Sequence, residues 1–165
     1  MSAGRLARHL CATRWSTRRQ FPPAALAAIE TAIREAESRH GGEIRFAVET
    51  ALDLPELWRG LAPRHRASQV FGQLGVWDTA QNNGVLLYVL MADRVVEIVA
   101  DRGIAALIQQ SEWDGICREM ERQFRDGRFM EGSVAAVHSV GRVLARHFPA
   151  ARHDADELPN QPVLL

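Results

Sequence analysis

The chain has 165 residues, which is enough for one domain with a hydrophobic core. Its 20 basic and 20 acidic side chains balance to a formal charge of zero, which argues against a nucleic-acid partner. The composition is that of a soluble globular protein, and Cys11 and Cys117 lack the spacing of a zinc site or a disulfide framework. We therefore expect reduced thiols and a cytoplasmic location.

Residues 1–20 form a basic amino-terminal segment without a carboxylate. They lack the long apolar run of a signal peptide, and no apolar run in the chain reaches the roughly 18 residues of a membrane span. Leu6 and Leu10 lie one helical turn apart and predict a short helix. Two interpretations are open: the helix contacts an anionic membrane, peripherally at the inner membrane, or it packs on its own domain with its arginines in solvent.

Residues 21–149 predict a single α/β domain. A helix is expected before Gly41 and Gly42, because Pro22-Pro23 fits a helix start and the apolar residues that follow recur at helical spacing. Residues 43–50 then alternate between apolar and other side chains, which predicts a strand with one face on the core.

A strand hairpin is the central feature of the second half of this domain. Residues 64–76 predict an amphipathic helix, and the apolar run 85–91 predicts a strand buried on both faces. Residues 95–100 predict its antiparallel partner across the short link Ala92-Asp93. Because a helix separates residues 43–50 from residues 85–91, these two strands should be parallel, with a right-handed crossover.

The remaining apolar periodicity predicts helices around residues 104–108, 113–124 and 134–144. Residues 150–165 are expected to be an irregular tail that packs back by its apolar end. The predicted fold is a three-layer α/β/α sandwich whose central mixed sheet includes the 85–91/95–100 hairpin.

From about Phe21 to Pro149 the chain resembles the TPM domain family. The resemblance rests on "HGGEIRFAVE", "RASQVFGQLGVWDTAQNNGVLLYVLMADRVVEIVADRGI", "FRDGRFMEG" and "HFP", with "DELPN" in the tail. It implies a mixed sheet between helices. Some members of the family are described as acid phosphatases or calcium binders, and others act in photosystem repair or receptor regulation. Bacterial members are often membrane-anchored or secreted, whereas this chain looks like the shorter, unanchored kind.

The chain departs from the family pattern after the second hairpin strand. Many members have Gly-aromatic-Gly-Leu-Glu there, followed by a further Asp. In this chain the corresponding stretch is Asp101 to Ala105, so Ala105 stands at the glutamate position. Asp114 stands for the later acid, at a longer spacing. The departure weakens the expectation of metal binding and of phosphatase chemistry.

The hairpin geometry brings the loop 78–83 to the same end of the sheet as Asp101 and the start of strand 43–50. Oxygen-rich clusters of this kind suit Ca²⁺ or Mg²⁺. The candidate metal ligands are Asp78, Asn82, Asn83 and Asp101. The further candidate binding residues are Glu43, Trp77 and Asp114. The alternative is structural: Asp78 caps a turn, Asn83-Gly84 supplies a positive φ, and Asp101 caps a helix.

The chain contains no GxSxG, P-loop or HExxH motif, so no catalytic residue is assigned. The leading hypothesis is a binding or assembly/repair module whose partner is another protein, acting at the membrane surface through residues 1–20. One alternative is a metal-assisted acid phosphatase in which Asp78 and Asp101 hold the cation. The other is a domain whose divalent metal is structural or regulatory. An exposed Trp77 would favour the binding module.

Overall fold

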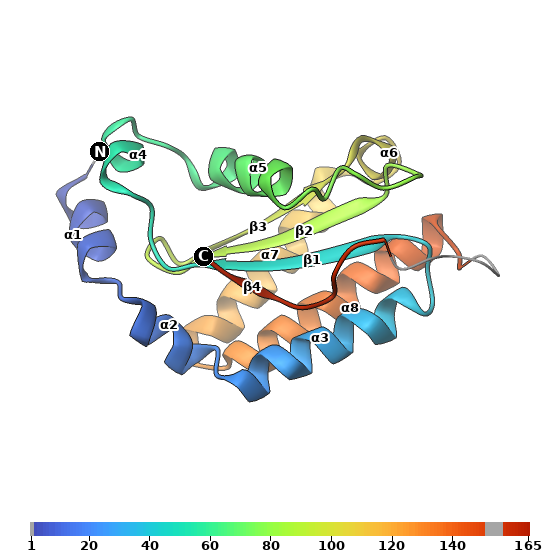
Figure 1. The fold of residues 1–165 in the computed structure, drawn as a ribbon, viewed down its shortest axis with the longest axis horizontal. Helices are drawn as coiled ribbons and strands as arrows, with labels where there is room; N and C mark the ends of the chain where they lie inside the picture. Colours follow the sequence, from blue (N-terminus) through green and yellow to red (C-terminus); the bar gives the residue numbers. More distant parts are fainter. Residues whose placement is uncertain (1, 151–156) are drawn as a thin grey trace.

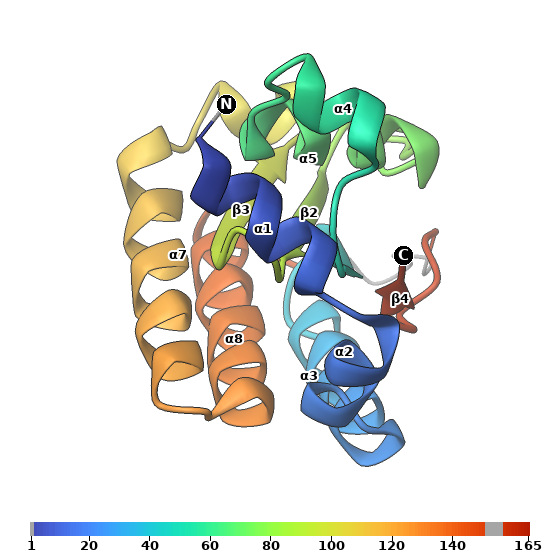
Figure 2. The same ribbon diagram turned by 90° about the vertical axis from the view of Figure 1, so that its left-hand side faces the viewer.

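The computed structural model describes residues 2–150 and 157–165. In these ranges, helices pack on both faces of a mixed sheet, as the sequence predicts (Figures 1 and 2). The strand order is β3-β2-β1-β4, in which the edge strand β4 was not predicted. The elements are α1 (Ala3–Cys11), α2 (Arg14–Gln20), α3 (Pro23–Glu37), β1 (Glu43–Glu49), α4 (Leu54–Trp58), α5 (Pro63–Gln73), β2 (Gly84–Leu90), β3 (Val95–Ala100), α6 (Arg102–Ala105), α7 (Gln110–Arg125), α8 (Phe129–His147) and β4 (Val163–Leu164).

The strand pairing confirms the predicted topology. β1 and β2 are parallel, with Glu43 opposite Gly84, and α5 lies in the connection between them. β2 and β3 form the antiparallel hairpin, with Val85 opposite Ala100. The link between them is longer than the predicted two residues, because it spans residues 91–94 and is closed by a 3.1 Å hydrogen bond from Arg94 N to Met91 O.

Two hydrophobic clusters lie on the two faces of the sheet. One joins the strands to α3, α7 and α8 and contains Ile44 and Phe46 of β1. The other joins the strands to α4 and α5 and contains Leu57 and Val70. In Figure 1, α4 and α5 lie above the sheet, and α3 and α8 lie below it. The sheet is therefore an interior layer.

The prediction that β1 has only one face on the core was wrong. Every residue of β1 is buried, including its charged side chains. The carboxyl-terminal segment covers part of the second face: the Arg45 guanidinium donates to the carbonyl oxygens of Pro159 and Gln161. The charged side chains that alternate with apolar ones in residues 43–50 are buried and have partners. In the sequence, the same alternation is typical of a strand with one face in solvent.

The end of the tail is not irregular. Val163–Leu164 forms β4, which pairs in parallel with β1 and places Val163 opposite Ala47. Residues 157–162 have no regular structure, and residues 151–156 lie outside the described residues. The apolar end of the chain therefore packs back on the domain by adding an edge strand to the sheet.

The amino-terminal segment packs on the domain through α1. Arg5 Nη2 lies 2.7 Å from Asp93 Oδ2 at the hairpin turn, and His9 Nε2 lies 3.1 Å from Asp93 Oδ1. His9 Nδ1 also accepts a 3.0 Å hydrogen bond from Leu52 N. Burial raises the pKa of Asp93, but the hydrogen bonds from Arg5 and His9 outweigh it, so the pKa lies below its ordinary value. Arg5 is thus engaged with the domain, whereas Arg14 is exposed.

In the part of the chain that the structure describes, no helix combines the length and apolar character needed to cross a membrane.

Candidate functional site

The loop that precedes β2 is held in place by its own backbone and by threonine. Asn82 N donates to Thr79 O at 3.2 Å, and Asn83 N donates to Thr79 Oγ1 at 3.0 Å. The residue with positive φ is Asn82, at 53°, and not Asn83 or Gly84 as the sequence suggested. Asparagine tolerates this left-handed conformation better than most residues, so the turn is stable without glycine.

The structure brings the predicted segments together at one end of the sheet. Asp101 N donates to Gly84 O at 2.9 Å, and Glu43 N donates to Asn83 O at 3.1 Å. Arg102 Nε also donates to Asn82 Oδ1 at 3.0 Å. We call this region, made of residues 74–83, residues 101–107 and Glu43, the loop end; it lies on the right in Figure 1.

Two glycines allow the backbones at the loop end to approach one another. A Cβ at Gly84 would lie 2.0 Å from Val76 O, and a Cβ at Gly103 would lie 2.6 Å from Asn82 O. Backbone atoms cannot move aside as a side chain can, so larger residues would displace the loop. The glycines that flank the apolar hairpin therefore fix the position of the polar loop.

The carboxyl-terminal segment also holds the loop end. Glu157 Oε2 accepts a 2.9 Å hydrogen bond from Ala80 N, and Glu43 Oε2 accepts a 3.1 Å hydrogen bond from Leu158 N. The Glu43 carboxylate, a candidate binding group, is thus buried and bonded to the chain itself.

Two buried oxygens at the loop end have no hydrogen-bond donor among the described residues. Asp101 caps α6, because its Oδ1 accepts from Arg102 N at 2.7 Å, but its Oδ2 has no such partner. Asn83 donates through Nδ2 to Gly41 O, while its Oδ1 likewise has no donor. Buried acceptors without a donor are rare and costly, and they can be satisfied by water or by a hard cation.

The other two candidate acids are placed less favourably for a metal. The Asp78 side chain is exposed. Asp114 lies on α7, where its Oδ1 accepts from Gln110 Nε2 at 2.9 Å. Burial raises the pKa of Glu97 on β3, and the charge of Asp114 adds to that effect. Across residues 2–150 and 157–165, no three His, Cys, Asp or Glu side chains are grouped to hold a metal.

Trp77 is 56% exposed, although it lies next to a tightly held loop. Leu107, just beyond α6, is 55% exposed. The backbone bond between Gly103 N and Asn82 O, at 3.1 Å, joins the two segments that carry these side chains. A large aromatic side chain on a rigid support is typical of a binding surface.

A buried polar network at the carboxyl end of β1 was not predicted. Arg66 Nη2 lies 2.7 Å from Glu49 Oε1, and the Tyr88 hydroxyl donates to the other carboxylate oxygen. The hydrogen bond to Glu49 raises the pKa of Arg66, and burial raises the pKa of Tyr88. The lone tyrosine in an apolar strand was the available signal. The network joins α5 to β1 and β2, and removing one of its charged members would leave the other buried without a partner.

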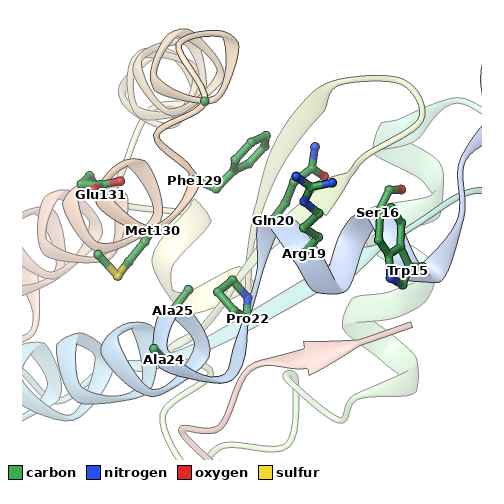
Figure 3. A pocket seen from close by; sticks show the side chains of 11 residues that line it. Trp15, Ser16, Arg19, Gln20, Pro22, Ala24, Ala25, Phe129, Met130 and Glu131 are labelled. Atoms are coloured by element: carbon green, nitrogen blue, oxygen red, sulfur yellow. The ribbon is translucent and has the colours of Figure 1, made fainter.

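Two cavities beside α2 were also missed. One, of about 590 Å³, is open to solvent and lies between α2, the start of α3 and the start of α8. In Figure 3, Trp15 and Arg19 line it from α2, and Met130 and Glu131 line it from α8. The other, of about 600 Å³, lies between α1, α2, the hairpin turn and α7. Each cavity combines residues far apart in the chain, so no local sequence pattern marks it.

Comparisons with known proteins agree with this architecture. The family model described as "TPM domain" matches residues 19–143. The solved structure of the BA42 protein from the psychrophilic bacterium Bizionia argentinensis is 34% identical, with a TM-score of 0.74; the match covers 86% of this chain and 93% of that one. The amino-terminal domain of the cg2496 protein from Corynebacterium glutamicum shares the fold, at 13% identity and a TM-score of 0.54, with 81% of each chain covered. A search of curated proteins found no significant match.

Proposed function

The chain belongs to the TPM domain family, and we propose that it acts as a protein-binding module whose contact surface is the loop end. The exposed Trp77 carries this proposal. Tryptophan at the centre of an interface commonly contributes a large share of the binding free energy, and a rigid support reduces the entropy lost on binding.

The surroundings of Trp77 support a contact surface more than a catalytic centre. The backbone N–H groups of Asp78 and Asn82 donate hydrogen bonds within the domain, and the Glu43 carboxylate accepts one from Leu158 N. Leu107 adds a second exposed apolar side chain at the same end. Asp78 is exposed and supplies a charge at the border of this apolar surface.

A pull-down from lysate of the producing organism tests the proposal. The immobilised protein should retain a partner that Trp77→Ala loses. Trp58→Ala is the matched control, because Trp58 is 75% exposed but lies on α4. The proposal fails if Trp77→Ala retains the same proteins as the wild type.

A membrane-surface role for the amino-terminal segment is a second proposal, supported by exposed apolar and basic side chains. Trp15 and Leu10 are exposed, as are Arg14 and Arg18. Trp and Arg together suit the boundary between lipid headgroups and water. Deleting residues 1–20 would remove the Arg5–Asp93 ion pair, so point variants give the cleaner test.

Flotation with anionic vesicles compares the wild type with Trp15→Ala and with Arg14→Gln/Arg18→Gln. The proposal predicts that flotation of the wild type falls in both variants and on addition of salt. Equal flotation of the three proteins, or none for the wild type, contradicts it.

A divalent cation at the loop end is the third proposal, supported by the two buried oxygens without donors, Asp101 Oδ2 and Asn83 Oδ1. Two oxygens suit a cation that keeps several water ligands, as Mg²⁺ often does, better than a cation enclosed by protein. Such a cation would either stabilise the fold or take part in phosphatase catalysis, in which it would activate a water molecule.

Thermal unfolding with Ca²⁺, Mg²⁺ or Mn²⁺ tests the cation. A cation that binds the native state raises the melting temperature, and Asp101→Asn, which keeps the helix cap, should abolish the rise. If the melting temperature does not rise at about millimolar concentrations of these cations, both the structural and the catalytic metal are contradicted, because a cation stabilises the protein only by occupying its site. If the rise occurs, phosphomonoester hydrolysis that is lost in Asp101→Asn distinguishes an enzyme from a structural site.

A further inference from the structure

The cavity of about 600 Å³ at the hairpin turn has the size of a small-molecule site. It is bounded by α1 and α2 on one side and by α7 and the start of α8 on the other, with the end of the β2–β3 hairpin between them. Part of its lining, which we call the floor, is apolar and includes Val89, Phe124 and Phe129. The rings of Phe124 and Phe129 lie 4.9 Å apart between centroids, so this part of the floor is a continuous apolar surface. We call the cavity the basic pocket.

The charged side chains of the basic pocket are unbalanced. Three arginines line it, Arg8, Arg94 and Arg125, against one carboxylate, Glu121. Glu121 Oε1 already accepts a 3.0 Å hydrogen bond from Val96 N. Arg8 is paired with Asp93, at 3.6 Å between Arg8 Nη2 and Asp93 Oδ1, whereas Arg94 and Arg125 have no side-chain hydrogen bond or ion pair within the described ranges. The pocket therefore presents positive charge above an apolar floor.

The backbone of Arg94 adopts a conformation that most side chains disfavour. Its φ is 57°, in the left-handed region where glycine or asparagine is favoured. Conformations of this kind cluster at ligand-binding and active sites, where the surrounding structure holds them in place. Here the side chain is a guanidinium that lines the pocket.

The wall formed by α1 is fixed to the turn that carries Arg94. Arg5 donates to both oxygens of Asp93, from Nε at 3.1 and 3.0 Å, and Arg8 Nε donates to Ala92 O at 3.1 Å. Asp93 is thus engaged by Arg5 and Arg8, and Arg94 and Arg125 are the pocket arginines left without a partner in the described ranges. A preformed wall also lowers the entropy cost of binding.

The geometry points to a binding site for a small amphipathic anion, a carboxylate on an apolar chain. The carboxylate would pair with Arg94 and Arg125, because guanidinium groups form charge-assisted hydrogen bonds with carboxylates. The apolar chain would lie on Val89, Phe124 and Phe129. This site is separate from the loop end, because it lies at the opposite ends of β1 and β2.

Protection of Cys11 from alkylation measures occupancy directly. Cys11 lines the pocket and is exposed, whereas Cys117 is buried and serves as an internal reference. Burial raises the pKa of the Cys117 thiol to about 12, so its reaction at neutral pH is slow. The probes are octanoate, 1-octanol, which lacks the charge, and acetate, which lacks the chain.

Octanoate should slow Cys11 alkylation saturably, at concentrations where 1-octanol and acetate have little effect. Arg94→Gly and Arg125→Gln should each raise the apparent Kd for octanoate at least about tenfold. The matched control is Arg39→Gln, which should leave the Kd unchanged. Arg39 is exposed and follows α3, at the other end of the sheet.

The proposal is overturned if octanoate does not protect Cys11, if 1-octanol protects it equally well, or if both arginine variants bind octanoate as the wild type does. Far-ultraviolet circular dichroism of each variant checks that it is folded. Loss of octanoate binding would not affect retention of a protein partner through Trp77, so the two proposals succeed or fail separately.

Discussion

The two ends of the sheet use polar residues in different ways. At the loop end, the polar side chains and backbone groups are bonded chiefly to the chain itself: Arg102 binds Asn82, and Glu157 binds Ala80 N. At the hairpin turn, Asp93 is paired with Arg5, but Arg94 and Arg125 have no partner among the described residues. The first end presents a rigid surface with an exposed tryptophan, and the second presents charge beside a cavity. Polar residues near the two ends of a buried hairpin can thus be bonded within the chain at one end and left without partners at the other.

The largest expected effect concerns the rigidity of the loop end. Gly84→Ala should lower the free energy of unfolding by about 3 kcal/mol, because its Cβ would meet Val76 O at 2.0 Å. Gly115→Ala is the control: nothing lies within 4 Å of its Cβ, and alanine favours a helix interior by roughly 0.5–1 kcal/mol. Urea unfolding measures both. A Gly84→Ala protein as stable as the wild type would contradict the rigid loop.

The second effect concerns the anchor of α1 on the hairpin turn. Asp93→Asn should lower the free energy of unfolding by about 2 kcal/mol at neutral pH, because it removes the charge paired with Arg5. Since the native pKa of Asp93 is lowered, this contribution is present above the unfolded pKa of about 4. It is lost as pH falls through the native pKa, so the wild type and the variant should converge below about pH 4. A difference that is independent of pH would contradict the charge pairing.

The third effect compares the two non-glycine residues with positive φ, one at each end. Arg94→Gly should stabilise the protein by about 1 kcal/mol, because it removes left-handed strain at φ 57°. Asn82→Gly should change stability little, since asparagine already tolerates φ 53° and glycine would lose the bond from Arg102. Thermal unfolding distinguishes them, with a rise of about 2–4 °C expected for Arg94→Gly. A loss of stability in Arg94→Gly would show that the arginine serves the fold.

The smallest effect on stability is expected at Trp77. Because the side chain is 56% exposed, Trp77→Ala should change the free energy of unfolding by less than about 0.5 kcal/mol. A large loss measured by urea unfolding would mean that Trp77 is part of the core and not of a contact surface.

The sequence was sufficient to predict the loop end because strand topology follows from local patterns. The apolar run 85–91 and its antiparallel partner place Asp101 beside the start of β2, and the parallel crossover adds Glu43. The bonding of the individual polar atoms does not follow from those patterns. Whether Asp101 caps a helix or binds a cation depends on the direction of each carboxylate oxygen.

The hairpin-turn end was not predictable in the same way. Arg8, Arg94 and Arg125 come from α1, the hairpin turn and α7, and Arg5 holds α1 at the turn. Nor did the alternation of residues 43–50 reveal that a distant tail covers Arg45. Long-range packing of this kind leaves no periodic signal in the segments that it joins.

Photo-crosslinking from the position of Trp77 tests the central claim most directly. In the producing organism, the photoreactive residue p-benzoylphenylalanine would replace Trp77 in one protein and Trp58 in a control. The proposed contact surface predicts a discrete crosslinked partner from position 77 that is missing from position 58. No adduct from position 77, or the same adducts from both positions, would contradict the assignment of the loop end as the binding surface.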